Sequence, residues 1–178
     1  MRILLAIPSL HLGGAETQFV HLANGLHRRG HQVIVAAFSS GGPLESALRG
    51  PKLHTLAKTS RLDNLAVFRR LIGLAREFRT DVYYGFLTLP NLMGALLRLT
   101  RPGLGLAFGL RASDMDLKRY GAAASLSTAL ERQASRLAGL AICNSEAGRA
   151  HAQRQGYRPG LLRVVPNGIE TVRCRPER

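Results

Sequence analysis

The chain has 178 residues and a mass of 19.3 kDa, which corresponds to one domain of ordinary size. Hydrophobic residues make up 46% and charged residues 20% of it, which excludes disorder, collagen-like sequence and a coiled coil. The charge is unusual, because 25 Lys and Arg against 11 Asp and Glu give a net charge of +14. Such a balance favours an anionic partner, such as nucleic acid, membrane headgroups or a phosphorylated substrate.

The first apolar run is too short for a secretory signal, because Pro8 ends it and Glu16 follows soon after. No uninterrupted apolar run reaches the roughly 18 residues that a membrane-spanning helix needs. Two cysteines, Cys143 and Cys174, are too few for a disulfide scaffold. We therefore expect a cytoplasmic protein with reduced thiols.

Strand-like and helix-like segments alternate along the whole chain. Short apolar runs predict strands at residues 2–8, 31–38, 53–56, 81–87, 104–110, 140–143 and 162–165. Helical periodicity and capping residues predict helices at residues 15–29, 44–48, 63–78, 90–101, 117–137 and 145–155. This order predicts a three-layer α/β domain with a mainly parallel sheet of about six or seven strands.

The predicted helix at 63–78 has a capping-box pattern formed by Ser60 and Asp63. Its apolar face is expected to consist of Leu65, Phe68, Ile72, Ala75 and Phe78. Ligands of parallel sheets bind beyond the carboxyl ends of the strands, so the loops that follow the strands are the candidate binding loops.

The first of these loops contains Gly13 and Gly14 at the start of a helix, where backbone N–H groups could face an anion. A simple tight turn is an equally good interpretation. The loop is not G-x-G-x-x-G, no acidic residue ends the second strand, and no P-loop is present, so a nicotinamide dehydrogenase and a P-loop NTPase are disfavoured.

The loop after the fifth strand contains Arg111 and Asp114, which suit anion binding and proton abstraction, although a structural salt bridge is the commoner reason for such a pair. The six histidines show no metal-ligand spacing, so no metal site is expected. No G-x-S-x-G elbow is present, and Cys143, within a strand, is expected in the core and not as a nucleophile.

Five motifs in order resemble glycosyltransferase family 4. They are the strand at residues 2–5, Gly-Gly-Ala-Glu-Thr at 13–17, the helix-to-strand segment at 22–33, Ile-Cys-Asn-Ser at 142–145 and Val-Val-Pro-Asn-Gly-Ile-Glu at 164–170. The loop at 111–116 is similar to a variant in members that build bacterial surface polysaccharides.

The resemblance implies one half of a GT-B architecture, in which two Rossmann-like domains face a cleft. Residues 1–168 would be the acceptor-side domain and residues 169–178 the start of a linker, with the donor-binding domain absent from this chain. A fragment of this kind is expected to fold but to be inactive alone. The family is mostly retaining and needs no metal or cofactor beyond the nucleotide-sugar donor.

Carried over by position, Gly13 and Gly14 would lie near the donor phosphates, and Arg111 and Asp114 near the acceptor, with Asp114 as the candidate catalytic group. Asn144 and Asn167 belong to the matched motifs and are candidate substrate contacts. Relatives often carry a histidine in the loop of Asp114, which this sequence lacks. The implied partners are a sugar or lipid-linked sugar acceptor and a nucleotide sugar.

Two alternative functions would also account for the positive charge. A nucleic-acid-binding module is disfavoured, because Tyr83, Tyr84 and Phe86 fall in a predicted buried strand and no nucleic-acid-binding signature is present. Peripheral contact with an anionic membrane stays open, through arginines at helix ends together with an apolar patch. That patch consists of Leu92, Met93, Leu96 and Leu97.

Overall fold

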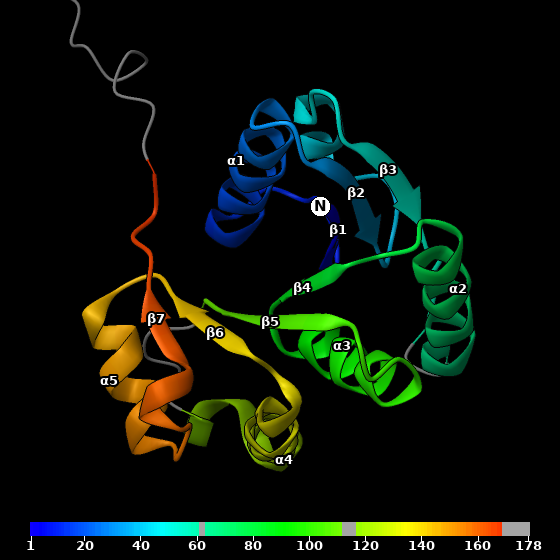
Figure 1. The fold of residues 1–178 in the computed structure, drawn as a ribbon. Helices are drawn as coiled ribbons and strands as arrows, with labels where there is room; N and C mark the ends of the chain where they lie inside the picture. The colour runs from blue at the N-terminus through cyan, green and yellow to red at the C-terminus, as the bar shows by residue number, and fades with distance from the viewer. Residues whose placement is uncertain (61–62, 112–116, 169–178) are drawn as a thin grey trace, which may run out of the picture.

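The computed structural model describes residues 1–60, 63–111 and 117–168, and within the helix that begins at residue 117 it describes side chains from residue 126 onward. These residues form a parallel seven-stranded sheet in the order β3-β2-β1-β4-β5-β6-β7, with helices packed against it (Figure 1). The strands are β1 (Arg2–Ile7), β2 (Gln32–Ala37), β3 (Lys52–Thr55), β4 (Val82–Phe86), β5 (Gly105–Leu110), β6 (Leu140–Cys143) and β7 (Leu162–Val164). The α-helices are α1 (Gly14–Arg28), α2 (Asn64–Glu77), α3 (Thr88–Thr100), α4 (Leu117–Ala134) and α5 (Glu146–Arg154).

All six strand pairings are parallel, so the prediction of a mainly parallel sheet is confirmed. The central strands are apolar on both faces because helices cover both sides. In β1, Leu4 and Ala6 belong to one buried cluster and Leu5 and Ile7 to the other. Helix α1 packs on the second cluster, and α2 and α3 pack on the first, which gives the three layers (Figure 1).

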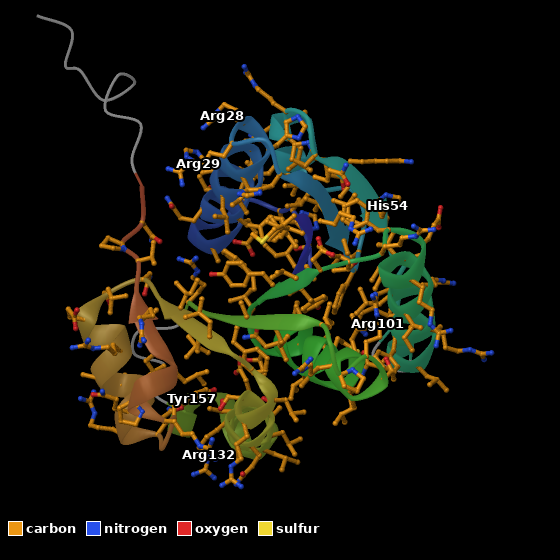
Figure 2. The ribbon with its side chains drawn as sticks, in the orientation of Figure 1. Arg28, Arg29, His54, Arg101, Arg132 and Tyr157 are labelled. Atoms are coloured by element: carbon orange, nitrogen blue, oxygen red, sulfur yellow. The ribbon has the colours of Figure 1, made fainter. Side chains whose placement is uncertain are left out.

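Helix α1 ends as the sequence predicts. Gly30 has φ +83°, a left-handed conformation that favours glycine, and its N–H donates to the carbonyl of His27. Arg28 and Arg29 lie at this end of the helix, on the outside of the molecule (Figure 2). Their positive charge complements the negative end of the helix dipole.

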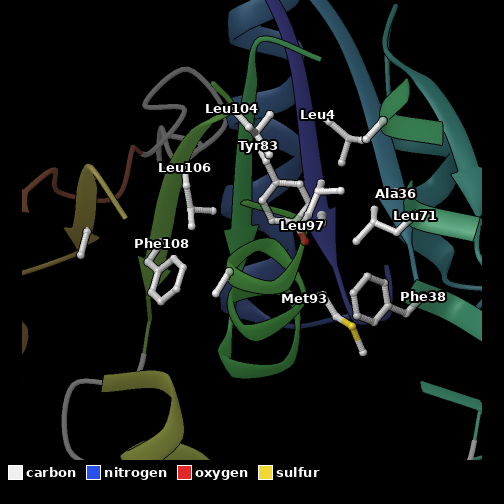
Figure 3. Packing of buried hydrophobic residues seen from close by; sticks show 14 of the residues in the cluster. Leu4, Ala36, Phe38, Leu71, Tyr83, Met93, Leu97, Leu104, Leu106 and Phe108 are labelled. Atoms are coloured by element: carbon white, nitrogen blue, oxygen red, sulfur yellow. The ribbon is translucent and has the colours of Figure 1, made fainter. Parts of the chain in front are cut away.

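The larger core cluster centres on Tyr83, which is fully buried between β4 and α3 (Figure 3). Its hydroxyl donates to the carbonyl of Pro90 at 2.8 Å, which satisfies the one polar atom of this side chain. Gly94 allows α3 to pass this closely, because a Cβ there would lie 2.4 Å from the Tyr83 ring. The core therefore depends on a glycine inside a helix.

Two local predictions are wrong in detail. In α2 only one residue of the predicted apolar face is misplaced, because Leu65 is 69% exposed. The other four predicted residues do face the core: Ala75 is buried, and Phe68, Ile72 and Phe78 pack partly buried against the cluster that contains Leu71. The predicted helix at 44–48 is a 3₁₀ turn at Pro43–Ala47, because five residues are too few for a stable α-helix.

Candidate functional site

The carboxyl ends of the strands meet at one edge of the sheet, here called the carboxyl edge, where the predicted binding loops lie. Arg111 follows β5 at this edge. Its Nη1 donates to Oδ1 of Asn167 at 3.1 Å, and its Nη2 lies 3.4 Å from the Tyr84 hydroxyl. Two of the predicted site residues, far apart in the sequence, are therefore in direct contact.

An aromatic platform supports the Arg111 guanidinium. Its Cζ lies 4.4 Å from the centre of the Phe86 ring, close enough for a cation–π interaction. Phe86 in turn contacts Phe19 of α1 edge-to-face, with ring centres 5.0 Å apart, and Tyr84 with ring centres 4.9 Å apart. Tyr84 and Phe86 share one face of β4 because strand side chains alternate.

Polar groups of the platform, on Tyr84 and Arg111, are buried. Burial raises the pKa of Tyr84, and the nearby positive charge of Arg111 opposes that rise. The Nε of Arg111 is buried and has no hydrogen-bond partner within the described part of the chain. The platform was not predicted, although two aromatic residues two apart in a strand that ends at the edge are a sequence signal for it.

The segment after β7 also reaches α1. The side-chain amide of Gln18 donates to the carbonyl of Gly168 at 2.8 Å, and the N–H of Gly168 donates to Oε1 of Gln18 at 3.1 Å. This paired contact places the Pro-Asn-Gly segment across the start of α1. The carboxyl edge thus brings together segments from both ends of the described chain.

Gly13 and Gly14 lie at the start of α1, as predicted, but neither requires a conformation that only glycine adopts. Gly13 is extended, with φ −176° and ψ 161°, and nothing lies within 4 Å of a Cβ built on Gly14. A Cβ on Gly13 would meet the carboxylate of Glu16 at 2.2 Å. Gly14 therefore provides uncovered backbone at a helix N-terminus, while the Glu16 carboxylate lies beside Gly13.

The remaining predicted residues are less informative. Asn144 is half-buried and directly precedes Ser145, whose hydroxyl accepts from the N–H of Gly148 and caps α5 as expected. Asp114 lies outside the described residues. Cys143 is buried in β6, where burial raises the pKa of its thiol, so the prediction of a core cysteine is confirmed.

A buried carboxyl group, Glu131, lies close to the same edge and was not predicted. It is 5% exposed, and its two oxygens accept from Oγ1 of Thr88 at 2.8 Å and from Nδ2 of Asn91 at 2.6 Å. Burial raises its pKa, and these two hydrogen bonds oppose the rise. Asn91 is fully buried in the apolar run of α3, and a polar residue in such a position is the signal that a buried partner exists.

Asn91 also holds the end of β5. Its Oδ1 accepts from the N–H of Gly109 and its Nδ2 lies near the carbonyl of Gly109, both at 3.3 Å. A cavity of about 80 Å³ lies beside this network. Its lining is Leu87, Thr88, Gly109, Leu110, Arg111, Thr128, Glu131, Gly148, His151, Ala152, Gln155 and Tyr157.

Three further predictions concern metal binding, membrane-spanning helices and the apolar patch on α3. Within residues 1–60, 63–111 and 117–168, no group of three or more His, Cys, Asp or Glu residues could hold a metal ion. None of the described helices is both long and apolar enough to cross a membrane. The predicted apolar patch is wrong in part, because Met93 and Leu97 are buried under α3, while Leu96 is exposed.

Comparison with solved structures gives the same architecture. Anabaena HepE in complex with UDP and glucose superposes with a TM-score of 0.75 at 24% identity, over 95% of this chain and 45% of that one. The lipopolysaccharide outer core galactosyltransferase WaaB gives 0.69 at 12% identity, over 95% and 46%. S. aureus MnaA with UDP gives 0.67 at 15% identity, over 93% and 44%. The chain thus spans less than half the length of each of these structures.

No curated protein matches the chain in sequence. The model of Glycosyltransferase Family 4 matches residues 12–173, which is most of the chain. The matched range includes the two glycines, the Arg111 platform and the Pro-Asn-Gly segment that meet at the carboxyl edge. The chain belongs to glycosyltransferase family 4.

Proposed function

We propose that this chain is the acceptor-side domain, residues 1–168, of a GT-B glycosyltransferase that takes its sugar from a nucleoside diphosphate sugar. The observation that carries the proposal is the contact between Arg111 and Asn167, which joins two family motifs at the carboxyl edge. The UDP and glucose bound in Anabaena HepE support a UDP-sugar donor. Roles in bacterial surface polysaccharide or glycolipid synthesis are part of the proposal.

The proposed reaction is the attack of an acceptor hydroxyl on the anomeric carbon of the donor sugar, while the nucleoside diphosphate leaves. Retention of configuration and independence from metals complete the proposal. Backbone N–H groups at the helix start marked by Gly13 and Gly14, together with the guanidinium of Arg111, would face the charge that develops on the leaving phosphate. Asp114 remains the proposed group near the acceptor, and most donor contacts would come from a second domain.

Peripheral contact with an anionic membrane is a weaker part of the proposal. The exposed side chains of Leu96 and Leu99 lie on α3, which also carries Arg98, so this helix is where such contact would occur. Vesicle co-sedimentation tests it, and equal binding to neutral and anionic vesicles argues against it. Nucleic acid remains disfavoured, because Tyr83 and Phe86 are fully buried and offer no stacking surface.

The activity test uses the purified chain of residues 1–178 with UDP-glucose and methyl hexoside acceptors. We expect neither glycoside product nor release of glucose, because the proposal assigns most donor contacts to a second domain. Product formation by this chain alone would overturn the assignment to an acceptor-side domain. Nucleotide binding as tight as that of a complete two-domain transferase would do the same.

A further inference from the structure

We propose that the cavity beside Glu131 is a subsite for a neutral, hydroxyl-bearing group of the acceptor, with the Glu131 carboxyl as its hydrogen-bond acceptor. This inference rests on the proposed function and specifies where in the domain the acceptor binds. Three observations carry it: an unusual buried acid, a cavity next to that acid, and a strained backbone where the cavity meets the carboxyl edge.

Glu131 is unusual because it is a buried acid without a basic partner among the described ion pairs. The chain carries 25 basic residues, yet within the described part of the chain the ion pairs are Arg2 with Asp81 and Arg149 with Glu146, and neither includes Glu131. Burying a carboxyl group without a cation is unfavourable, so a purely structural site would be better served by an amide. The presence of this acid next to a cavity therefore indicates a role toward a ligand.

The hydrogen bonds of Glu131 leave capacity for a further donor. Each carboxylate oxygen can accept two hydrogen bonds, and Thr88 and Asn91 each supply one, at 2.8 and 2.6 Å. The two protein donors also fix the orientation of the carboxyl group. A sugar hydroxyl entering the cavity can therefore donate to an oxygen that is already held in place.

The cavity has a suitable size and a mixed lining. Its volume of about 80 Å³ is several times what one water requires, so it can take one edge of a pyranose ring but not a whole disaccharide. The polar side chains of Thr88 and His151 line it together with the apolar Ala152 and the buried ring of Tyr157. A few polar groups on an apolar lining are typical of sites for small neutral ligands.

The cavity also meets the carboxyl edge. Leu87, directly after β4, has φ 72° and ψ 168°, a conformation that is costly for any residue other than glycine. The hydrogen bond from its N–H to the carbonyl of Gly109, at 3.2 Å, holds it there. Leu87 and Arg111 both line the cavity, so a sugar edge bound within it lies next to the Arg111 platform.

The test compares binding of methyl α-glucoside, methyl α-galactoside and methyl α-mannoside to the chain of residues 1–178 by saturation-transfer NMR. We expect at least one glycoside to bind, and Glu131→Gln to weaken it by about tenfold or more, since a hydrogen bond to a charged group is lost. Glutamine can still accept from Asn91 and donate to the Thr88 hydroxyl, so the fold is expected to survive. Glu146→Gln, at the exposed start of α5, is the matched control and should bind as the unmodified chain does.

Amide chemical shifts distinguish the possible failures. Shifts at Gly109, Gly148 and Ala152 support the subsite, and Thr88→Val provides a second variant if Glu131→Gln does not fold. Glycoside binding that leaves these amides unchanged and shifts Gly13 and Gly168 would overturn the subsite but keep the proposed function. Absence of binding by all three glycosides would overturn the subsite, and unchanged affinity in Glu131→Gln and Thr88→Val would do so too.

Discussion

At the scale of single residues, the position of Arg111 depends on the side chains that its guanidinium contacts. Its guanidinium lies over Phe86, reaches Tyr84 and donates to Asn167, so three segments depend on one planar group. Lysine carries the same charge but lacks the planar fork, and it cannot hold these contacts at once. Arg111 therefore connects the position of the Pro-Asn-Gly segment to the aromatic platform.

Arg111→Lys should loosen the segment at residues 165–168 without unfolding the domain. We expect lower heteronuclear ¹H–¹⁵N NOE values for the amides of Val165, Asn167 and Gly168. Arg158→Lys, an exposed arginine before β7, is the control and should leave these values unchanged. Equal NOE values in the unmodified chain and Arg111→Lys would show that the contact with Asn167 does not hold the segment.

Glu131 leads to a prediction about pH. Burial raises its pKa above the ordinary 4.5, so the folded state holds the proton more tightly than the unfolded state does. The contribution of this group to the free energy of unfolding is therefore largest at low pH and falls as the pH rises through 4.5 toward the folded-state pKa. Glu131→Gln cannot ionise, so its free energy of unfolding relative to the unmodified chain should rise over that range.

Urea unfolding between about pH 4 and pH 8 measures this difference. Glu146→Gln, which replaces an exposed carboxylate, is again the control and is measured in parallel. A difference for Glu131→Gln that stays constant, or that falls with rising pH, would contradict the burial described for this carboxyl group.

At the scale of secondary-structure elements, most of the fold could be predicted from the sequence. Buried strands are short apolar runs, and glycine and capping residues end the helices, so these signals are local. Leu65 was wrongly assigned to the buried face of α2 because it fits a helical period as well as Leu71 does, and only the sheet decides which one is buried. The same limit applies to Glu131 and Asn91: the polar Asn91 in an apolar run signals a buried partner, but the contact spans 40 residues, so no local pattern identifies Glu131 as that partner.

Gly94 allows a test of how closely helix α3 packs against Tyr83. Gly94→Ala should lower the free energy of unfolding by about 1–3 kcal/mol, because the new Cβ would lie 2.4 Å from the Tyr83 ring. Gly73→Ala in α2 is the matched control, because no atom lies within 4 Å of its Cβ position. It should raise stability by about 0.5–1 kcal/mol through helix propensity alone. Urea unfolding of both variants checks the pair, and equal effects would contradict the close approach of α3 to Tyr83.

At the scale of the whole molecule, the positive charge has a structural explanation at the edge opposite the site. Helices that follow parallel strands end at the amino edge of the sheet, where their C-terminal carbonyls attract cations. Arginines occupy the ends of α1, α2, α3 and α5: Arg28, Arg29, Arg76, Arg79, Arg98, Arg101 and Arg154. Arg101 donates to the carbonyl of Ala75 at 2.7 Å in this way.

The net charge of +14 is therefore a poor guide to where the proposed acceptor would bind. The motifs at the carboxyl edge are a better guide, because strand ends, the Arg111 platform and the cavity beside Glu131 gather there. An acceptor sugar should consequently bind at the edge that carries fewer of the helix-terminal arginines. The arginines at the helix ends and the proposed site therefore lie at opposite edges of the sheet.

Amide chemical-shift mapping of the ¹⁵N-labelled chain with the methyl hexosides tests that claim most directly. We predict shifts at the carboxyl edge, at residues such as Leu87, Arg111 and Gly168, and no shifts at Gly103, Gly139 and Gly160, which precede β5, β6 and β7 at the amino edge. Shifts that concentrate at these three glycines, or no shift at either edge, would contradict the assignment of this chain as an acceptor-binding domain.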